Sequence, residues 1–398
     1  MNFNFPRTFG QQEAKDNLRQ ALAQERFPHA LLIHGEPGLG QHALLLDLAQ
    51  ILCCESKKQK PCGECFSCKA FQSGSLESIQ YLIPLVKKEK ASKDSDGGEE
   101  DLNSAQIEEL SDLIRDWHDQ PYGFSVTEKA MVRVPQTREL LGRLGYARDR
   151  GNARVVLVPY LEALNTEAAN ALLKTLEEPS EDVYFLIASE NRAALLPTLL
   201  SRCMHLGLTP LPKDEFQETA STLSAQAGKP FSPRLLPFAE GSPGGYLDLL
   251  ERGGEELLEE SAKFLAATTA PDWRMFADYT NQGYVAEGLE ETARLLLFLL
   301  RCLRVHQNLK AQHPAHMSGR ENNYQWTSQA LKAEGWDSSL VSYLGPFEDI
   351  VDLPAFATYL QSAFQAVKNY SRPQIALLGL FLEYETKTHR SSHAGVAT

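Results

Sequence analysis

The spacing of apolar and polar positions divides the chain into two kinds of structure. Continuous apolar runs of strand length stand at 29–34, 155–158 and 183–188. Such runs are typical of parallel strands that are covered on both faces. From about residue 255 onward, apolar positions recur at helical spacing in one segment after another, as at 289–304. The pattern therefore predicts an α/β domain with a parallel sheet, followed by an all-α region.

One stretch departs from both patterns. Residues 87–101 (KKEKASKDSDGGEED) mix charges of both signs and lack an apolar anchor, which predicts a mobile insertion. Helical spacing returns over 103–118, at positions such as Leu110 and Trp117. We therefore expect a charged and helical insertion over about 87–130, and the sequence does not disclose its purpose.

A glycine-rich loop follows the first predicted strand. Residues 35–42 (GEPGLGQH) match the phosphate-binding pattern G-x-x-x-x-G-K-[ST] in their glycines and in their place between a strand and a helix. Such glycines let backbone N–H groups approach a phosphate. However, Gln41 replaces the lysine that neutralises the terminal phosphates, and His42 replaces the hydroxyl that ligates magnesium. We therefore interpret Gly35, Gly38, Gly40 and Gln41 as a degenerate, non-functional ATP site.

The strand at 155–158 carries a second loss of the same kind. In a working ATPase such a strand ends in Asp-Glu, where one carboxylate holds magnesium and the next orients the attacking water. Pro159 and Tyr160 occupy those places, and neither side chain can do either job. Two damaged motifs in the correct order predict a nucleotide-binding fold that has lost its catalysis.

A cluster of cysteines follows the helix after the glycine loop. Cys62, Cys65 and Cys68 form two overlapping C-x-x-C turns, and Cys53 and Cys54 lie just upstream. Four thiolates can close a tetrahedral structural zinc site. A disulfide fits poorly without an export signal, and a redox pair would not need three evenly spaced cysteines. Counting back from Cys62 favours Cys53 as the fourth ligand.

Four features together resemble a known family. They are the run NTEAANALLKTLEEP at 165–179, the triplet Ser201-Arg202-Cys203, His29-Ala30 before the glycine loop, and the cysteine cluster after it. They resemble the delta-prime subunits of the bacterial DNA polymerase III clamp loader, over about residues 5–85 and 130–250. Members of that family are commonly degenerate at the phosphate loop. The end of the helix before the cluster resembles the family best with Cys54 as the ligand, so we choose Cys54, Cys62, Cys65 and Cys68.

The resemblance implies AAA+ architecture, with an α/β nucleotide-binding domain, a small helical lid and a helical collar. The expected domains are the α/β domain at 1–208 with a zinc module at about 54–70, the lid at 209–253, the collar at 254–386 and a flexible tail at 387–398. Gly241-Ser242-Pro243-Gly244 resembles the second-sensor motif of the lid, but Gly245 stands where active relatives carry arginine.

The resemblance also assigns a role to Arg202. Active AAA+ rings place an arginine of one subunit against the γ-phosphate held by its neighbour, where it offsets charge in the transition state. Ser201-Arg202-Cys203 resembles that motif without damage. The alternative is an arginine that pairs with a nearby carboxylate. A basic stretch from Arg133 to Arg154 resembles the place of a DNA-contacting helix, with a solvated helix face as its alternative.

Length and charge limit the possible functions further. A chain of 398 residues with 43% hydrophobic residues suffices for two or three domains. No run approaches the roughly 18 apolar residues of a membrane span, and the first residues show no signal-peptide pattern, so we expect no membrane contact and a cytoplasmic location. A net charge of −13 argues against a protein that coats nucleic acid by itself.

These observations predict a non-hydrolysing clamp-loader subunit within the DNA polymerase III holoenzyme. It would support ATP-dependent loading of the sliding clamp on primer-template DNA, with gamma/tau and delta subunits as partners and a structural zinc ion. Two alternatives stay open. An active gamma/tau-type ATPase would need Lys, Thr and two acids at positions 41, 42, 159 and 160, and a zinc-containing AAA+-like scaffold outside replication has no feature in its favour.

Overall fold

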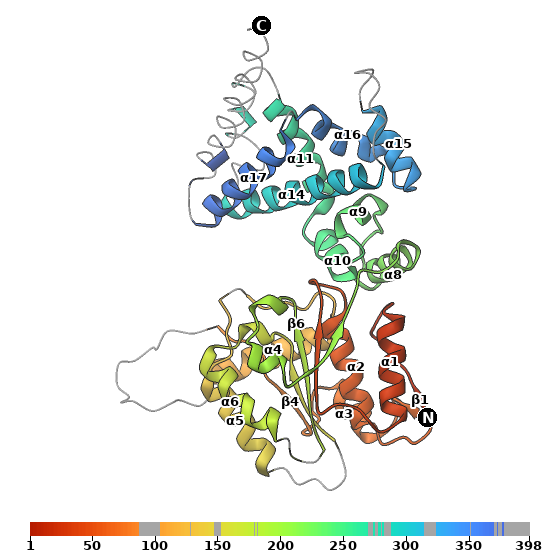
Figure 1. Ribbon diagram of the computed structural model, residues 1–398, viewed down its shortest axis with the longest axis vertical. Coiled ribbons are helices and arrows are strands. Elements are labelled where there is room, and N and C mark those ends of the chain that lie inside the picture. Colours follow the sequence, from red (N-terminus) through yellow and green to blue (C-terminus); the bar gives the residue numbers. More distant parts are fainter. Residues whose placement is uncertain are drawn as a thin grey trace, which may run out of the picture. The chain divides into compact units, whose positions relative to one another are not determined.

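The computed structural model describes most of the chain (Figure 1). The described residues are 1–86, 104–127, 129–146, 153–178, 180, 182–269, 274, 278–279, 281, 288–313, 324–350, 352–369, 372 and 376–377. They form two compact units, residues 1–223 with 241–247 and residues 224–240 with 248–398. The predicted charged insertion at 87–101 and the tail at 387–398 lie outside the described residues.

A five-stranded parallel sheet forms the centre of the first unit. Its strands, in spatial order, are β4 (Ile79–Tyr81), β5 (Arg154–Val158), β6 (Val183–Ser189), β2 (Ala30–His34) and β7 (Met204–Gly207). In the register of the central pair, Ile33 lies opposite Ala188 and His34 opposite Ser189. Because all strands run in one direction, the loops that carry the ATPase motifs meet at the carboxyl edge of the sheet.

Helices cover both faces of this sheet, as the continuous apolar strands require. One face carries the helices α1 (Gln12–Ala23), α2 (Gln41–Cys53), α3 (Phe66–Gln72) and α4 (Ser104–Asp119). The other face carries α5 (Val134–Tyr146), α6 (Thr166–Glu177) and α7 (Pro197–Leu200). Neighbouring residues of β2 alternate between the two cores, with Leu31 and Ile33 in the first and Leu32 in the second.

The rest of the described chain is helical. The segments after the sheet are α8 (Lys213–Gln226), η3 (Pro233–Leu235), α9 (Leu236–Ala239), α10 (Pro243–Glu251), α11 (Gly254–Thr269), α14 (Leu289–Gln312), α15 (Gln325–Ala333), η4 (Ser338–Leu340), α16 (Val341–Leu344), η5 (Gly345–Asp349) and α17 (Leu353–Lys368). In the second unit, α14 packs against α11 and α17. These elements confirm the predicted fold class in outline, an α/β domain with a parallel sheet followed by helices. No helix within the described ranges combines the length and apolar character that a membrane span requires.

The expected insertion contributes a packed helix. Helix α4 corresponds to the helical pattern at 103–118, and Trp117 near its end is fully buried in the first core. Leu110, Leu113 and Ile114 pack against the same core. The helical part of the insertion therefore belongs to the sheet domain, and it brings the following loop toward the carboxyl edge of the sheet.

A buried carboxylate fastens the N-terminal segment to helix α2. The Asp47 side chain is fully buried, and its oxygens accept hydrogen bonds from the backbone N–H groups of Arg7 and Thr8 at 3.0–3.2 Å. The Thr8 hydroxyl donates to Asp47 at 2.8 Å, and Arg7 Nη1 donates at 3.2 Å. The Lys15 ammonium donates to the Thr8 carbonyl at 2.5 Å. This network holds the N-terminal segment beside the helix that follows the glycine loop.

We expect Asp47→Ala to lower the free energy of unfolding by about 3 kcal/mol, because it leaves several buried donors without an acceptor. Asp16→Ala is the matched control: Asp16 pairs with Arg19 in an exposed i,i+3 contact, and its loss should change the stability far less. Urea denaturation followed by circular dichroism measures both variants. Equal destabilisation of the two would contradict the role given to Asp47.

Candidate functional site

The glycine loop between β2 and α2 is closed by contacts with the segment Ser242–Gly245. Gly244 N donates to Gly38 O at 2.9 Å, and Ser242 Oγ donates to Pro37 O at 2.9 Å. Gly38 has a φ of +78°, and a Cβ there would lie 2.7 Å from Gly245 N. Only glycine fits this approach, so the loop and the segment that resembles the second sensor are in direct backbone contact.

The side-chain amide of Gln41 is hydrogen-bonded to two carbonyl groups of the same loop. Its Nε2 donates to Gly35 O at 2.9 Å and to Glu36 O at 2.7 Å, and the side chain is buried. A buried amide group that is hydrogen-bonded in this way costs free energy to displace. Gln41 therefore links two carbonyls of the loop, at the position from which a lysine would reach toward phosphate.

His42 lies in a cage of aromatic rings. Its ring centroid is 4.7 Å from that of Tyr160, 5.4 Å from Phe124 and 6.0 Å from Trp117. The Nε2–H group donates to Pro159 O at 3.1 Å, and Trp117 Nε1 donates to His42 O at 3.2 Å. Burial lowers the pKa of His42 to about 4, so the ring is neutral near pH 7.

Two tyrosines complete this arrangement. The Tyr122 hydroxyl accepts from Phe9 N at 2.8 Å and lies against Gly40, where a Cβ would come within 2.9 Å of it. The Tyr160 hydroxyl donates to Phe124 O at 3.0 Å. Burial raises the pKa of both phenols above their ordinary value, so both stay protonated. The space beside the glycine loop is thus filled by the protein's own rings.

Sequence reasoning missed three of these rings. Trp117, Tyr122 and Phe124 come from the end of α4 and the loop after it, within the insertion whose purpose the sequence did not disclose. Trp117 was visible only as one apolar position at helical spacing, and no motif marks Tyr122 or Phe124. Three aromatic residues fall between positions 117 and 124, which could have marked this segment as buried. Their number does not indicate which loop they contact.

Two carboxyl groups lie at the carboxyl ends of β5 and β6. Glu190 N donates to Glu162 Oε1 at 2.9 Å, and burial together with the charge of Glu162 raises the pKa of Glu190 to about 7. Ser189, which ends β6, is buried and its hydroxyl accepts from Asn191 N at 3.2 Å. Ser189 therefore shapes the turn after the strand.

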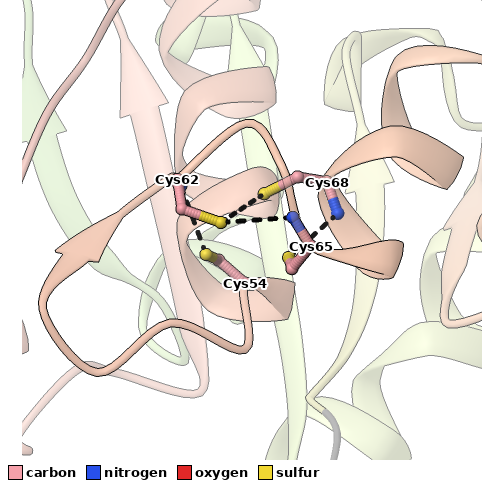
Figure 2. Close-up of side chains that lie close together, drawn as sticks. All are labelled: Cys54, Cys62, Cys65 and Cys68. Carbon is pink, nitrogen blue, oxygen red and sulfur yellow. Dashed lines mark hydrogen bonds between the residues drawn. The ribbon is translucent and has the colours of Figure 1, made fainter.

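The four predicted zinc ligands lie together (Figure 2). The sulfur atoms of Cys54, Cys62, Cys65 and Cys68 are all within 4.8 Å of one another. A zinc ion with Zn–S bonds of about 2.3 Å needs sulfurs about 3.8 Å apart. The Cys62 and Cys68 sulfurs are 4.0 Å apart. The spacing and the donor set therefore fit a tetrahedral zinc ion.

Local backbone geometry turns N–H groups toward these sulfurs. Cys62 N donates to Cys54 Sγ, Cys65 N to Cys62 Sγ and Cys68 N to Cys65 Sγ, each at 3.4 Å. Figure 2 draws these bonds as dashed lines among the four cysteines. Cys65 is the N-cap residue of that helix. Such bonds favour thiolates, because they offset negative charge on sulfur.

Cys53 is separate from this cluster. Its sulfur donates to Ala153 O at 3.6 Å and accepts from the Ser78 hydroxyl at 3.7 Å. Burial raises the pKa of Cys53 to about 11, which keeps it a thiol. The cysteine that lies beside Cys62, Cys65 and Cys68 is therefore Cys54, and Cys53 lies apart from them.

Arg202 follows α7 and is partly exposed. Its Nη1 donates to Thr198 O at 2.8 Å and to Ser201 Oγ at 3.3 Å, and its Nη2 forms an ion pair with Glu177 at the end of α6. Leu199 and Cys203, on either side of Arg202 in sequence, are buried in the second core. The buried residues on either side therefore fix the backbone at Arg202. Its guanidinium group is paired with a carboxylate of the same chain.

The expected basic helix is α5, which begins at Val134. Arg133 Nη1 donates to Leu85 O at 3.4 Å, and Arg143 pairs with Glu139 one turn earlier. Arg154 donates to Leu144 O. Arg148 and Arg150 lie outside the described residues. Among the described arginines named here, each has a partner within the chain.

Comparison with known proteins identifies the family. The family model described as DNA polymerase III, delta subunit, matches residues 10–212. The DNA polymerase III subunit delta' of Yersinia pestis is 34% identical over 191 residues, which is 47% of this chain and 44% of that protein. The corresponding subunit of Escherichia coli K12 is 28% identical over 275 residues, 69% of this chain and 70% of its own length.

A third relative is the DNA polymerase III subunit tau/gamma of Haemophilus influenzae, 29% identical over 251 residues, 62% of this chain and 30% of that protein. The matched part of the chain therefore spans less than half of the Yersinia and Haemophilus proteins. The family model itself covers half of this chain. The chain belongs to the DNA polymerase III delta-subunit family, among the delta-prime clamp-loader subunits, which confirms the resemblance found in its sequence.

Proposed function

We propose that this protein is a non-hydrolysing subunit of the clamp-loader complex, which supports ATP-dependent loading of the sliding clamp on primed DNA. The observation that carries the proposal is the closed glycine loop. Its carbonyls are bound by Gln41, its backbone contacts Ser242–Gly245, and aromatic rings enclose His42. A triphosphate binds to backbone N–H groups of such a loop, and it would need room beside Gly38 and Gly40, where the Ser242–Gly245 segment and the Tyr122 ring lie.

The chemistry of hydrolysis lacks its charged groups at this site. Phosphoryl transfer depends on a cation at the terminal phosphates, a metal ion and a group that positions water. Gln41 and His42 are neutral, and Pro159 offers only a carbonyl, which already accepts from His42. The carboxyl groups of Glu162 and Glu190 follow β5 and β6, and the Glu162 carboxylate accepts a hydrogen bond from the backbone N–H of Glu190. These residues support binding of neither magnesium nor a catalytic water.

We further propose that Arg202 acts on the ATP of a neighbouring subunit. A guanidinium group is permanently charged and can bind phosphate oxygens with two parallel hydrogen bonds. Arg202 is partly exposed and stands between two buried residues that fix its backbone. A chain that combines an intact arginine with a closed glycine loop suits a subunit that assists catalysis without performing it.

The proposed partners are the gamma/tau and delta subunits, the sliding clamp and primer-template DNA reached through the complex. Relatives of this chain include tau/gamma and delta' subunits of DNA polymerase III. The expected location is the cytoplasm. Co-purification tests this assignment: tagged protein should bring down gamma or tau together with delta, which a scaffold outside replication would not do.

The proposed metal is one structural zinc ion held by Cys54, Cys62, Cys65 and Cys68. Four thiolates leave no open position, so the ion would have no catalytic role. The strand β3 (Gln59–Lys60) lies within this cysteine loop and pairs with β1 (Asn2–Phe3). Zinc binding would therefore hold together the cysteine loop, α3 and the first residues of the chain.

The isolated protein should release no phosphate from ATP above background, because its own site lacks the cation, the metal ligands and the water-orienting acid. A phosphate-release assay on a preparation free of gamma and tau measures this. Turnover that persists in such a preparation and disappears in a Gly40→Ala variant would overturn the proposal, since it would come from this loop.

Untagged protein should contain one zinc ion per chain by elemental analysis. Cys54→Ser should lose most of the metal, whereas Cys53→Ser is the matched control and should keep it, because the Cys53 sulfur points toward Ala153 and Ser78. Removal of zinc with a chelator should also lower the thermal stability, since thiolate sites contribute to folding. Zinc-free native protein would contradict the assignment.

Arg202→Ala should leave assembly intact and slow clamp loading by a reconstituted complex. The rate at the one affected ATP site should fall by up to about 10³-fold if Arg202 matches arginine fingers elsewhere. Because other subunits contribute sites of their own, total ATP hydrolysis falls only in part, and clamp loading is the better measure. Loading at the wild-type rate would show that Arg202 is only structural.

A further inference from the structure

The guanidinium group of Arg202 is held by groups of its own chain. Nη1 donates to the carbonyl of Thr198 and to the hydroxyl of Ser201, and Nη2 is paired with the Glu177 carboxylate. An arginine offers five N–H donors in a rigid plane. The two terminal nitrogens, which would bind phosphate as a fork, are both occupied here.

The partners of Arg202 come from two helices that are in contact with each other. Glu177 is the last residue of α6, and Thr198 O belongs to the short helix α7, which contacts α6. The carbonyl groups at the end of a helix such as α6 carry partial negative charge, and a carboxylate there adds to it. A cation beside Glu177 relieves this repulsion.

We infer that Glu177 acts as a latch, which holds Arg202 in an inactive position until the γ-phosphate of a neighbouring subunit displaces the carboxylate. The inference rests on the proposed role of Arg202 in trans. Glu177 is a positioning residue in this scheme, because it acts on the phosphate only through the arginine. No covalent bond changes during the exchange, since one anion replaces another at the same guanidinium group.

Charge and exposure both favour displacement of the Glu177 carboxylate by the phosphate over simultaneous binding of both anions to Arg202. A carboxylate left beside the bound phosphate would repel it, so the two anions compete for the arginine. The ion pair is partly exposed, with 29% of the Arg202 side chain and 47% of the Glu177 side chain accessible. Exposed pairs shift an equilibrium by at most about fivefold, so the latch is weak enough to open when the neighbouring site is filled.

The latch can be tested first in the isolated chain, without any ATP site. Phenylglyoxal modifies arginine most readily when the guanidinium group is free of a carboxylate partner. Mass spectrometry of the protease digest gives the modification rate of Arg202, with the exposed Arg192 as an internal reference. Glu177→Gln should raise the rate at Arg202 severalfold and leave Arg192 unchanged. The neighbouring exposed residue provides the matched control, Glu178→Gln, which should change neither rate.

The second test uses the reconstituted clamp loader without clamp or DNA, where the arginine is expected to be latched. Glu177→Gln should raise the ATP hydrolysis rate by up to about fivefold, the factor that an exposed ion pair contributes. Glu178→Gln should leave the rate unchanged. The double variant Glu177→Gln/Arg202→Ala should match Arg202→Ala alone, because the latch has nothing else to hold.

The outcomes separate the inference from the proposal on which it rests. If Arg202→Ala leaves both hydrolysis and clamp loading unchanged, the role in trans is wrong. If Arg202→Ala slows them but Glu177→Gln leaves hydrolysis unchanged or slows it, the arginine acts in trans and the latch is wrong. Equal rates of Arg202 modification in the wild type and Glu177→Gln would also overturn the latch.

Discussion

The structure of this domain depends on how the chain itself holds a glycine loop of the phosphate-binding type. The carbonyl groups of this loop accept hydrogen bonds from other parts of the chain, and such a bond contributes about 1 kcal/mol. Here the partners come from the chain itself: the Gln41 amide for the carbonyls of Gly35 and Glu36, and the Ser242–Gly245 segment for those of Pro37 and Gly38. The aromatic rings around His42 then exclude water from the same region.

Much of the fold was accessible from local sequence patterns. The strands at 29–34, 155–158 and 183–188 and the helix at 103–118 appear within one residue of their predicted ends, because their apolar periodicity is strong. The grouping of Cys54 with the later cysteines followed from a resemblance, and spacing alone pointed to Cys53. At the end of α2, the Cys53 thiol contacts the carbonyl of Ala153, whereas the Cys54 thiol lies among the later cysteines.

Contacts between distant segments could not be predicted in this way. Asp47 bonds to residues about 40 positions earlier, and the ring of Phe124 meets that of His42 from the insertion. The pairing of Arg202 with Glu177 joins two helix ends that are 25 residues apart. No periodicity or motif encodes such pairs, since they depend on how the sheet brings the ends of separate strands and helices together.

Under the proposed function, the aromatic cage makes the loss of the ATP site hard to reverse. A lysine at position 41 would bring a positive charge into a closed loop that contains no phosphate to pair with it. A threonine at position 42 would leave a cavity among Trp117, Phe124 and Tyr160. An acid at position 160 would remove one wall of the cage. Each of these changes alone would destabilise the fold before it restored any chemistry, so a chain with this packing could gain a working ATP site only through several changes made together.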